Sequence, residues 1–241
     1  MVQLAIHLQN VSKSFQKTKI IHQLNLDVKD GSIFGLIGPS GGGKTTIIKM
    51  MLGMLPADEG TITVLEHKVP HEPLLYQIGY MAQADALYTD LTGHENLSFF
   101  GSMFHLNKKK LQERIEYVAE LVDLTTFLKR KVGLYSGGMR RRLSLAIALI
   151  QDPPLLILDE PTVGIDPALK KKIWHELIHL KNNGKTILVT THAMDEAAQC
   201  DELAMLREGS IIANGSPSEL LEQFGVVSLD DVFLQAGGVE K

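Results

Sequence analysis

The feature that most constrains the fold of this chain is a glycine-rich segment between an apolar run and a helical pattern. The segment reads Gly38-Pro39-Ser40-Gly41-Gly42-Gly43-Lys44-Thr45 and follows a predicted strand over residues 32–37. Glycines let the backbone curl so that successive N–H groups point inward and surround an anion. A helix that begins near Lys44 adds the positive end of its dipole. Strand, loop and helix together predict an α/β core with a phosphate-binding loop.

Two side chains give this loop its expected chemistry. Lys44 supplies a full positive charge to the β- and γ-phosphates of a nucleotide, and the Thr45 hydroxyl can ligate Mg²⁺. A chance match to the pattern in such a chain is on the order of 1%, so an ordinary glycine-rich turn is the weaker interpretation. The predicted nucleotide-binding residues of the loop are Gly38, Pro39, Ser40, Gly41, Gly42, Gly43, Lys44, Thr45 and Thr46.

A pair of carboxylates ends a second apolar run. Residues 155–158 are apolar, and Asp159 and Glu160 follow them directly. Ligands bind at the carboxyl ends of parallel strands, where both side chains would emerge. Asp159 is therefore predicted to be a second partner of Mg²⁺. Glu160 is predicted to act as general base or to orient the attacking water.

Hydrophobic patterns predict how the elements follow one another. The first third reads as strands and turns, with a helix over 45–55, and alternation in 20–28 predicts one face formed by Ile20, His22, Leu24 and Leu26. From about residue 85 to 132 the pattern is helical. Strands at 155–159 and 186–190 then alternate with helices, which implies a parallel sheet covered on both faces.

Composition excludes several classes of protein. The chain has 241 residues, 44% hydrophobic and 22% charged, which is an ordinary globular mix. A net charge of −4 argues against a general nucleic-acid binder, so nucleic acid is not an expected partner. The single cysteine, Cys200, excludes a disulfide scaffold or Cys-rich metal site within one chain and fits a reducing cytosol. We expect it to be buried and inert.

Membrane segments are not expected in this chain. The first residues lack the basic and apolar regions of a signal peptide. The longest purely apolar run is residues 145–150, whereas a membrane-spanning helix needs about 20 residues. Any work on a membrane is therefore expected to go through a partner.

Five motifs in order make nearly the whole chain, from Leu4 to about Pro217, similar to the nucleotide-binding domain of ABC transporters. They are the phosphate loop, Gln83 after residues 78–82, the signature-like segment 135–139, the acid pair, and His192 at a strand end. The shorter motifs are weak alone but specific in this order. The resemblance implies a phosphate-loop NTPase core, RecA-like with a mostly parallel sheet, an antiparallel β subdomain and an inserted helical subdomain. The predicted boundaries are 1–225 for this domain, with the helical subdomain at about 85–150, and 226–241 for a tail.

The signature-like segment contains Ser136, Gly137 and Gly138 at the start of a predicted helix. A glycine-rich helix start is an anion site, although Ser136 could simply cap the helix. In the family, two cassettes pack head to tail, and this segment of each binds the γ-phosphate held by the other's phosphate loop. The outer residues Tyr135 and Met139 depart from the commoner Leu and Gln, at positions not expected to be critical for the backbone. The arginines at 140–142 are predicted to form a solvated basic face, with pairing of one of them across the interface between cassettes as the alternative.

The resemblance also implies roles for four isolated residues. Gln83 would touch Mg²⁺ or the attacking water, and His192 would hydrogen-bond the γ-phosphate. Asp166 would lie in a loop that signals between the two sites. Phe15 falls where the family places an aromatic residue that stacks on adenine, with a plain core or edge phenylalanine as the alternative.

The function implied by the resemblance is that of an ATP-binding and ATP-hydrolysing subunit that uses Mg²⁺. It would act at the cytoplasmic face of the cell membrane, or stay cytoplasmic when isolated, with integral membrane subunits and a second nucleotide-binding subunit, by default another copy of this chain. Residues 228–234 and 139–142 resemble those of exporter cassettes, which favours export over import. The alternative for the tail is an amphipathic helix in which Leu229, Val232 and Phe233 cover the core.

Two rival classes stay open at this stage. A soluble ABC ATPase of DNA repair or translation would carry a long coiled-coil insert or two fused cassettes, and the sequence has neither. A kinase or GTPase-like switch would lack residues 136–138 and the His192 position. Co-purification with an integral membrane protein would separate a transporter subunit from both.

Overall fold

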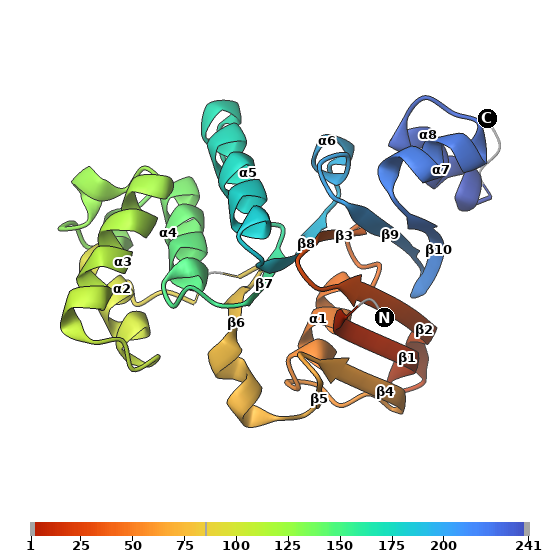
Figure 1. Cartoon of the computed structure of the whole chain (residues 1–241), viewed down its shortest axis with the longest axis horizontal. Helices are drawn as coiled ribbons and strands as arrows, with labels where there is room; N and C mark the ends of the chain where they lie inside the picture. The colour runs from red at the N-terminus through yellow and green to blue at the C-terminus, as the bar shows by residue number, and fades with distance from the viewer. Residues whose placement is uncertain (1–2, 85, 239–241) are drawn as a thin grey trace. The chain divides into compact units, whose positions relative to one another are not determined.

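The computed structural model describes residues 3–84 and 86–238, which divide into two compact units (Figure 1). Unit 2 comprises residues 76–185, and unit 1 is formed by the residues before and after them. In Figure 1, unit 1 is coloured red to orange and blue, and unit 2 runs from yellow through green to teal.

An antiparallel sheet forms the first part of unit 1, as predicted. Its strands follow the order β2-β1-β4-β5, and β1 pairs with both β2 and β4. The strands are β1 (Leu4–Phe15), β2 (Thr18–Lys29), β4 (Glu59–Val64) and β5 (His67–Lys68).

Strand β2 differs from the prediction in the face that it buries. Leu24 and Leu26 are buried as expected, but Ile21 is buried in place of Ile20, and His22 is exposed. The backbone at Gln23 has a φ of +43°, and the pairing with β1 shifts register on either side of it. Such a bulge switches the side of the sheet to which the following residues point, so a regular alternation predicts the wrong face before Gln23.

A second sheet of unit 1 carries the parallel strands. Strand β3 (Ile33–Ile37) lies between β8 (Thr186–Thr191) and β9 (Glu202–Arg207) and is parallel to both, and β10 (Ser210–Gly215) is antiparallel to β9. All residues of β3 and β8 are buried, as expected for strands covered on both faces. Helix α1 (Lys44–Met51) follows β3 and ends before Gly53, whose φ is +68°. The helix is therefore shorter than the predicted 45–55.

Between residues 192 and 238, unit 1 has three α-helices after β8: α6 (Met194–Ala197), α7 (Pro217–Phe224) and α8 (Leu229–Ala236). Leu229 and Val232 of α8 are buried in a cluster with Ile37 and Met205, and Phe233 packs against it. The tail is thus an amphipathic helix that covers the core of unit 1, which was one of its two interpretations.

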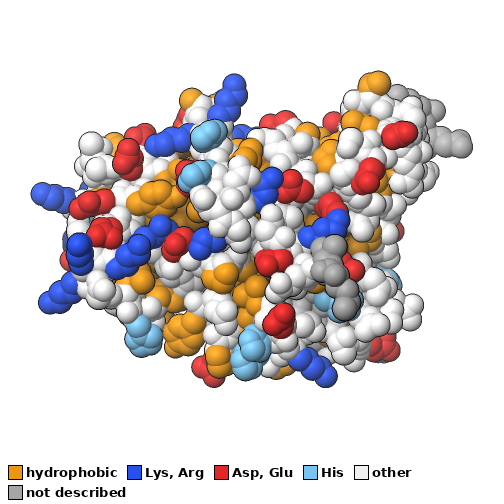
Figure 2. Space-filling view, viewed as in Figure 1, with side chains coloured by type: hydrophobic (Ala, Val, Ile, Leu, Met, Phe, Trp, Pro, Cys, Tyr) orange, Lys and Arg blue, Asp and Glu red, His pale blue; other side chains and the backbone are white. Residues whose placement is uncertain are grey.

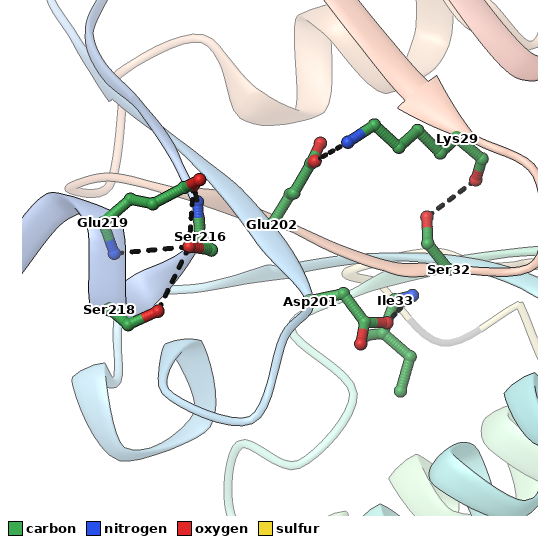
Figure 3. Close-up of polar contacts among 8 residues, drawn as sticks. All are labelled: Lys29, Ser32, Ile33, Asp201, Glu202, Ser216, Ser218 and Glu219. Carbon is green, nitrogen blue, oxygen red and sulfur yellow. Dashed lines mark hydrogen bonds and ion pairs between the residues drawn. The ribbon is translucent and has the colours of Figure 1, made fainter. Parts of the chain in front are cut away.

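Polar contacts in unit 1 link residues of different strands and cap the start of helix α7 (Figure 3). Lys29 of β2 pairs with Glu202 of β9, and the Asp201 carboxylate accepts a hydrogen bond from the Ile33 N–H at 2.8 Å. Helix α7 begins with a capping box, in which the side chains of Ser216 and Glu219 each accept from the other's backbone N–H.

Among its described residues, unit 2 contains a pair of parallel strands and four α-helices. Strand β6 (Ile78–Met81) pairs with β7 (Leu155–Asp159). The helices are α2 (Gly93–Ser102), α3 (Lys108–Leu121), α4 (Gly137–Leu149) and α5 (Pro167–Asn182). Leu143 and Ala146 of α4 and its C-cap Ile150 are buried and Met139 is half-buried, so these residues form one apolar stripe along the helix.

The surface of unit 2 carries many basic side chains. On the face shown in Figure 2, Lys and Arg side chains are numerous over the helices of this unit, mixed with Asp and Glu. The lysines at 108–110 are exposed. Within the ranges 3–84 and 86–238, no helix combines the length and the apolar character needed to cross a bilayer.

Candidate functional site

The phosphate loop, residues 38–46, joins β3 to α1 in unit 1. A Cβ on Gly38 would lie 2.4 Å from the carbonyl oxygen of Leu206, so no larger residue fits there. Gly41 and Gly43 have φ values of +79° and +105°, in the region that glycine adopts without strain. The close approach of Leu206 thus explains the glycine at position 38, and the positive φ angles explain those at 41 and 43.

Lys44 places a positive charge inside this loop. Its side chain is buried, and Nζ donates hydrogen bonds to the carbonyl oxygens of Gly38 at 2.7 Å and Pro39 at 3.1 Å. Helix α1 begins at Lys44, and its N-cap, Gly43, has no side chain with which to cap it. The positive helix end and the ammonium therefore lie at the same loop, an arrangement suited to a phosphate group.

His192 lies at the same edge of the sheet as the phosphate loop. Ile37 of β3 is paired with Thr191 of β8, so Gly38 and His192 are the next residues along two neighbouring parallel strands. The His192 side chain is exposed. Unit 1 therefore brings two of the sequence-predicted motifs together, where ligands of parallel sheets bind.

Phe15 is an exposed aromatic residue at the end of β1. Its side chain is 46% exposed, and the Lys13 ammonium lies 5.8 Å from the ring centroid. The core interpretation of Phe15 is therefore wrong. Stacking on a base, or a plain edge position, are the interpretations that fit.

The acid pair ends β7 in unit 2, beside the segment that carries Gln83. Asp159 and Glu160 are both buried, and Glu160 has a φ of +53°. Met81 of β6 pairs with Leu158 of β7, so the residues that follow the two strands emerge at one edge. Gln83 is exposed there. The structure thus brings Gln83, Asp159 and Glu160 together, as expected from parallel strands.

Arg141 is a residue whose importance the sequence reasoning missed. It was predicted to belong to a solvated face, but it is only 8% exposed. Its Nη1 atom donates to the carbonyl oxygens of Ala82 at 2.7 Å and Gln83 at 2.9 Å. Its Nη2 atom donates to the carbonyl oxygens of Asp159 and, at 2.8 Å, of Glu160.

A signal for Arg141 was present in the helical pattern. Arg141, Leu145 and Ala148 follow one another at intervals of four and three residues, and all three are buried. The neighbouring Arg142 also binds carbonyl oxygens, those of Val122 at 3.1 Å and Asp123 at 3.0 Å. The basic run therefore has structural partners rather than a purely solvated face.

The signature-like segment begins α4 at the surface of unit 2. The exposed Ser136 is the N-cap, and its hydroxyl accepts a hydrogen bond from the Met139 N–H at 3.2 Å. A Cβ on Gly137 would meet nothing within 4 Å, whereas one on Gly138 would lie 3.2 Å from the carbonyl oxygen of Gly164. Ser136 thus caps α4 locally. The space beside Gly137 at this helix start is open.

The loop that contains Gly164 also contains Asp166, so the segment 136–138 and this loop approach each other. Asp166 caps α5 by accepting a hydrogen bond from the Leu169 N–H at 3.0 Å. Its local role is that of a helix cap. The signalling role implied by the resemblance stays a prediction.

Tyr135 anchors the signature-like segment more firmly than the sequence indicated. Its ring is buried, and its hydroxyl donates to the carbonyl oxygen of Phe127 at 2.8 Å. A Cβ on Gly93 would lie 2.3 Å from that hydroxyl. Burial raises the pKa of Tyr135, so the phenol stays a donor. Tyrosine at position 135 is larger than the commoner leucine, and Gly93 of α2 provides the space for it.

The proposed magnesium ligands come from both units: Thr45 from unit 1, and Gln83 and Asp159 from unit 2. Their joint role stays a prediction. In the part of the chain that the structure describes, no group of three or more His, Cys, Asp or Glu is placed to hold a metal ion. A Mg²⁺ site made of one hydroxyl, one carboxylate and substrate phosphates needs no such group.

Comparison with known proteins decides the family. A family model described as ABC transporter matches residues 21–163, which is more than half of the chain. The chain belongs to the ABC transporter family. This member of the family is 45% identical over 223 residues to Nod factor export ATP-binding protein I of Sinorhizobium fredii, covering 91% of the chain and 65% of that protein.

A second relative is ABC transporter G family member 20 of Dictyostelium discoideum. It is 44% identical over 235 residues, which cover 96% of this ABC transporter chain and 32% of the relative. The chain therefore spans just under two thirds of the rhizobial protein and about one third of the Dictyostelium protein.

Solved structures of ABC transporter cassettes have the same fold. An ATP binding subunit of an ABC transporter superposes with a TM-score of 0.90 at 26% identity, over 98% of this chain and 100% of that one. A dimeric ATP-binding cassette in a post-hydrolysis state bound to ADP and Pi gives a TM-score of 0.81 at 25% identity, over 88% of this chain and 98% of that one. The predicted α/β phosphate-loop fold is confirmed.

Proposed function

We propose that this chain binds and hydrolyses ATP as a subunit of an ABC transporter and powers export through separate integral membrane subunits. The observation that carries the proposal is the presence of two helix starts suited to phosphate on one chain. Helix α1 begins in the phosphate loop with Lys44, and α4 begins at the exposed Ser136 beside the open position of Gly137. A single triphosphate bound to one chain does not require both.

Two copies of the chain would use both helix starts. The phosphate loop of one copy binds the nucleotide, and residues 136–138 of the other copy bind its γ-phosphate from the opposite side. The similarity to a cassette whose solved structure is dimeric and holds ADP and Pi supports this arrangement. The exposed Phe15 ring, in the same unit as the phosphate loop, stacks on adenine.

Hydrolysis in this proposal depends on the polar groups at the carboxyl ends of the parallel strands in the two units. Thr45 and Asp159 offer the hard oxygen donors that Mg²⁺ prefers, with Gln83 as a further oxygen ligand. An Mg²⁺ ion held by these residues would neutralise charge on the phosphates. Glu160 orients the attacking water and accepts its proton, and His192 donates a hydrogen bond to the γ-phosphate. Asp166 belongs to the loop that signals between the nucleotide sites of the two copies.

The membrane partner would contact the segment after Gln83. In α2 and the residues before it, the rings of Tyr88 and Phe99 lie 4.9 Å apart, and both are more than 40% exposed. An exposed aromatic pair fits a protein partner better than water. Export is supported by the rhizobial relatives, which are named as export proteins. The chain would then act at the cytoplasmic face of a membrane.

The decisive experiment replaces Glu160 by glutamine. Glu160→Gln keeps the shape of the side chain but cannot accept a proton, so we expect kcat for ATP hydrolysis to fall on the order of 10²- to 10⁴-fold. ATP binding, measured by calorimetry, should be unchanged. Glu222→Gln, an exposed position on α7, is the matched control and should hydrolyse at the wild-type rate.

The same experiment separates binding from chemistry when Lys44→Ala is included. This variant should lose ATP affinity, because the ammonium at the phosphate loop is removed. Hydrolysis at the native rate by Glu160→Gln would show that Glu160 is wrongly assigned. Wild-type affinity in Lys44→Ala would contradict the phosphate-loop assignment.

A soluble ABC ATPase that is not coupled to transport is the alternative function. Purification of the native protein from membranes distinguishes the two, because a transporter subunit should co-purify with an integral membrane protein. A native protein that stays cytosolic without such a partner would refute the transport role and leave the ATPase role standing.

A further inference from the structure

Arg141 connects two segments of the candidate site within unit 2. Its guanidinium binds one pair of carbonyl oxygens after β6, on Ala82 and Gln83, and another pair after β7, on Asp159 and Glu160. We propose that Arg141 is a positioning residue for ATP hydrolysis, which holds the main chain of Gln83 and that of Glu160 in one arrangement. This inference rests on the proposed function.

The backbone at Glu160 explains why such support is needed. Glu160 has a φ of +53°, which side-chain-bearing residues rarely adopt and which persists only where the surroundings fix it. The carbonyl oxygens of Asp159 and Glu160 belong to the peptide groups on either side of the Glu160 Cα. Arg141 binds both of them. It thereby fixes the direction in which the Glu160 carboxylate leaves the backbone.

Arginine is the side chain that can make all four contacts. Its guanidinium is planar and presents five N–H donors in a fixed fork, whereas lysine offers a compact point charge. Because Met81 pairs with Leu158, the two carbonyl pairs emerge at one edge, within reach of a single fork. A lysine at this position would keep the charge but could not hold both pairs in the same way.

The position of Arg141 on α4 extends the link to the signature-like segment. Helix α4 begins at Gly137 with Ser136 as its cap, and Arg141 lies on its buried face with Leu145. A displacement of this helix would therefore move the Gln83 and Glu160 segments with it. Within unit 2, the γ-phosphate contact proposed for residues 136–138 and the hydrolytic groups would move as one body.

The kinetic test compares Arg141→Lys with Arg142→Lys in the full chain. We expect Arg141→Lys to lower kcat on the order of 10- to 100-fold, because small displacements of positioned groups have effects of this size. The KM for ATP should stay near wild type, since the phosphate loop and Phe15 belong to unit 1. Arg142→Lys should keep wild-type kcat, because Arg142 binds carbonyl oxygens at the end of α3 instead.

A second measurement does not depend on ATPase activity. Amide hydrogen exchange is compared between wild type and Arg141→Lys in peptides that cover 78–84 and 155–163. Both should exchange faster in the variant, while a peptide over 111–122 should be unchanged. An inactive wild type would contradict the proposed function, and this measurement would still decide whether Arg141 holds the two segments.

Three results would overturn the inference. One is a folded Arg141→Lys with wild-type kcat. Another is faster exchange in only one of the two segments, in neither, or throughout unit 2. If Arg141→Lys does not fold, Arg141→Gln is measured in the same way, since its amide can still donate to one carbonyl pair. Failure of both variants to fold would make Arg141 a residue of the folding core and not a positioning residue.

Discussion

Cys200 shows how a single side chain is matched to its surroundings in unit 1. The thiol is buried, and a Cβ on Gly35 of β3 would lie 2.9 Å from its sulfur, so the glycine provides its space. Burial raises the pKa of Cys200 to about 12, and the carboxylates of Asp201 and Glu196 add to the effect. The sequence-based expectation of a buried thiol is confirmed, and the raised pKa makes it unreactive near neutral pH.

We therefore expect the native chain to resist thiol reagents at pH 8 and to react once it is denatured. Because the folded pKa lies above the ordinary value of 9.0, the neutral buried thiol contributes stability that is fully present below pH 9. This contribution is lost as the pH rises from 9 to 12. Cys200→Ala should therefore lose less stability than wild type over that range, as measured by denaturant unfolding. Rapid modification of the native chain would contradict the expectation.

At the scale of elements, side chains cap the starts of helices through hydrogen bonds with the backbone. Helix α7 has a complete capping box of Ser216 and Glu219, and α2 has one formed by Thr92 and Glu95. Hydrogen bonds from Ser216 lower the pKa of Glu219. The carboxylate therefore contributes stability above its ordinary pKa of 4.5, and this is lost as the pH falls through the lowered value.

Removal of the cap of α7 should destabilise unit 1 measurably. We expect Ser216→Ala to lower the free energy of unfolding by about 1 kcal/mol at neutral pH. The neighbouring Ser218→Ala, which leaves the reciprocal bonds of the box in place, should change it by less than about 0.5 kcal/mol. Urea unfolding at pH 7 measures both. Equal effects of the two substitutions would show that the box does not stabilise α7.

At the scale of the whole molecule, the proposed function requires two copies that close on each other. Ser136 is exposed at the start of α4, and Gly137 beside it leaves open space. A large cation at Ser136 can therefore be accommodated by the monomer but would occupy the place of a second copy's nucleotide. The effect of such a substitution belongs to the assembly.

We expect Ser136→Arg in the Glu160→Gln background to abolish the ATP-dependent dimer while ATP binding by the monomer persists. Size-exclusion chromatography with light scattering, with and without ATP, measures the dimer, and calorimetry measures binding. Ser218→Arg, at an exposed position of α7, is the control and should dimerise normally. Dimers of Ser136→Arg with ATP would mean that Ser136 serves only as a cap.

The phosphate loop, the acid pair and the helical stripes could be predicted from the sequence because each depends on neighbouring residues. The β3 strand, the glycines of the loop and α1 follow one another directly, and β7 ends in Asp159 as expected. The stripe of α5, with Leu169, Ile173, Leu177 and Leu180, is buried as its spacing requires. Periodicity and the conformational freedom of glycine are properties of short segments, so one sequence reveals them.

Tertiary structure alone decided the features that depend on distant residues. Arg141 binds the carbonyl oxygen of Gln83, 58 positions away, and that of Asp159, 18 positions away. The face of β2 depends on a bulge at Gln23 and its register with β1, and Tyr135 depends on the space at Gly93. The helical spacing of Arg141 indicates which face of α4 it occupies, but the carbonyl oxygens that it binds there are brought to it by packing, and the local pattern carries no record of them. The sequence determined the chemistry at the strand ends, and packing determined what holds that chemistry in place.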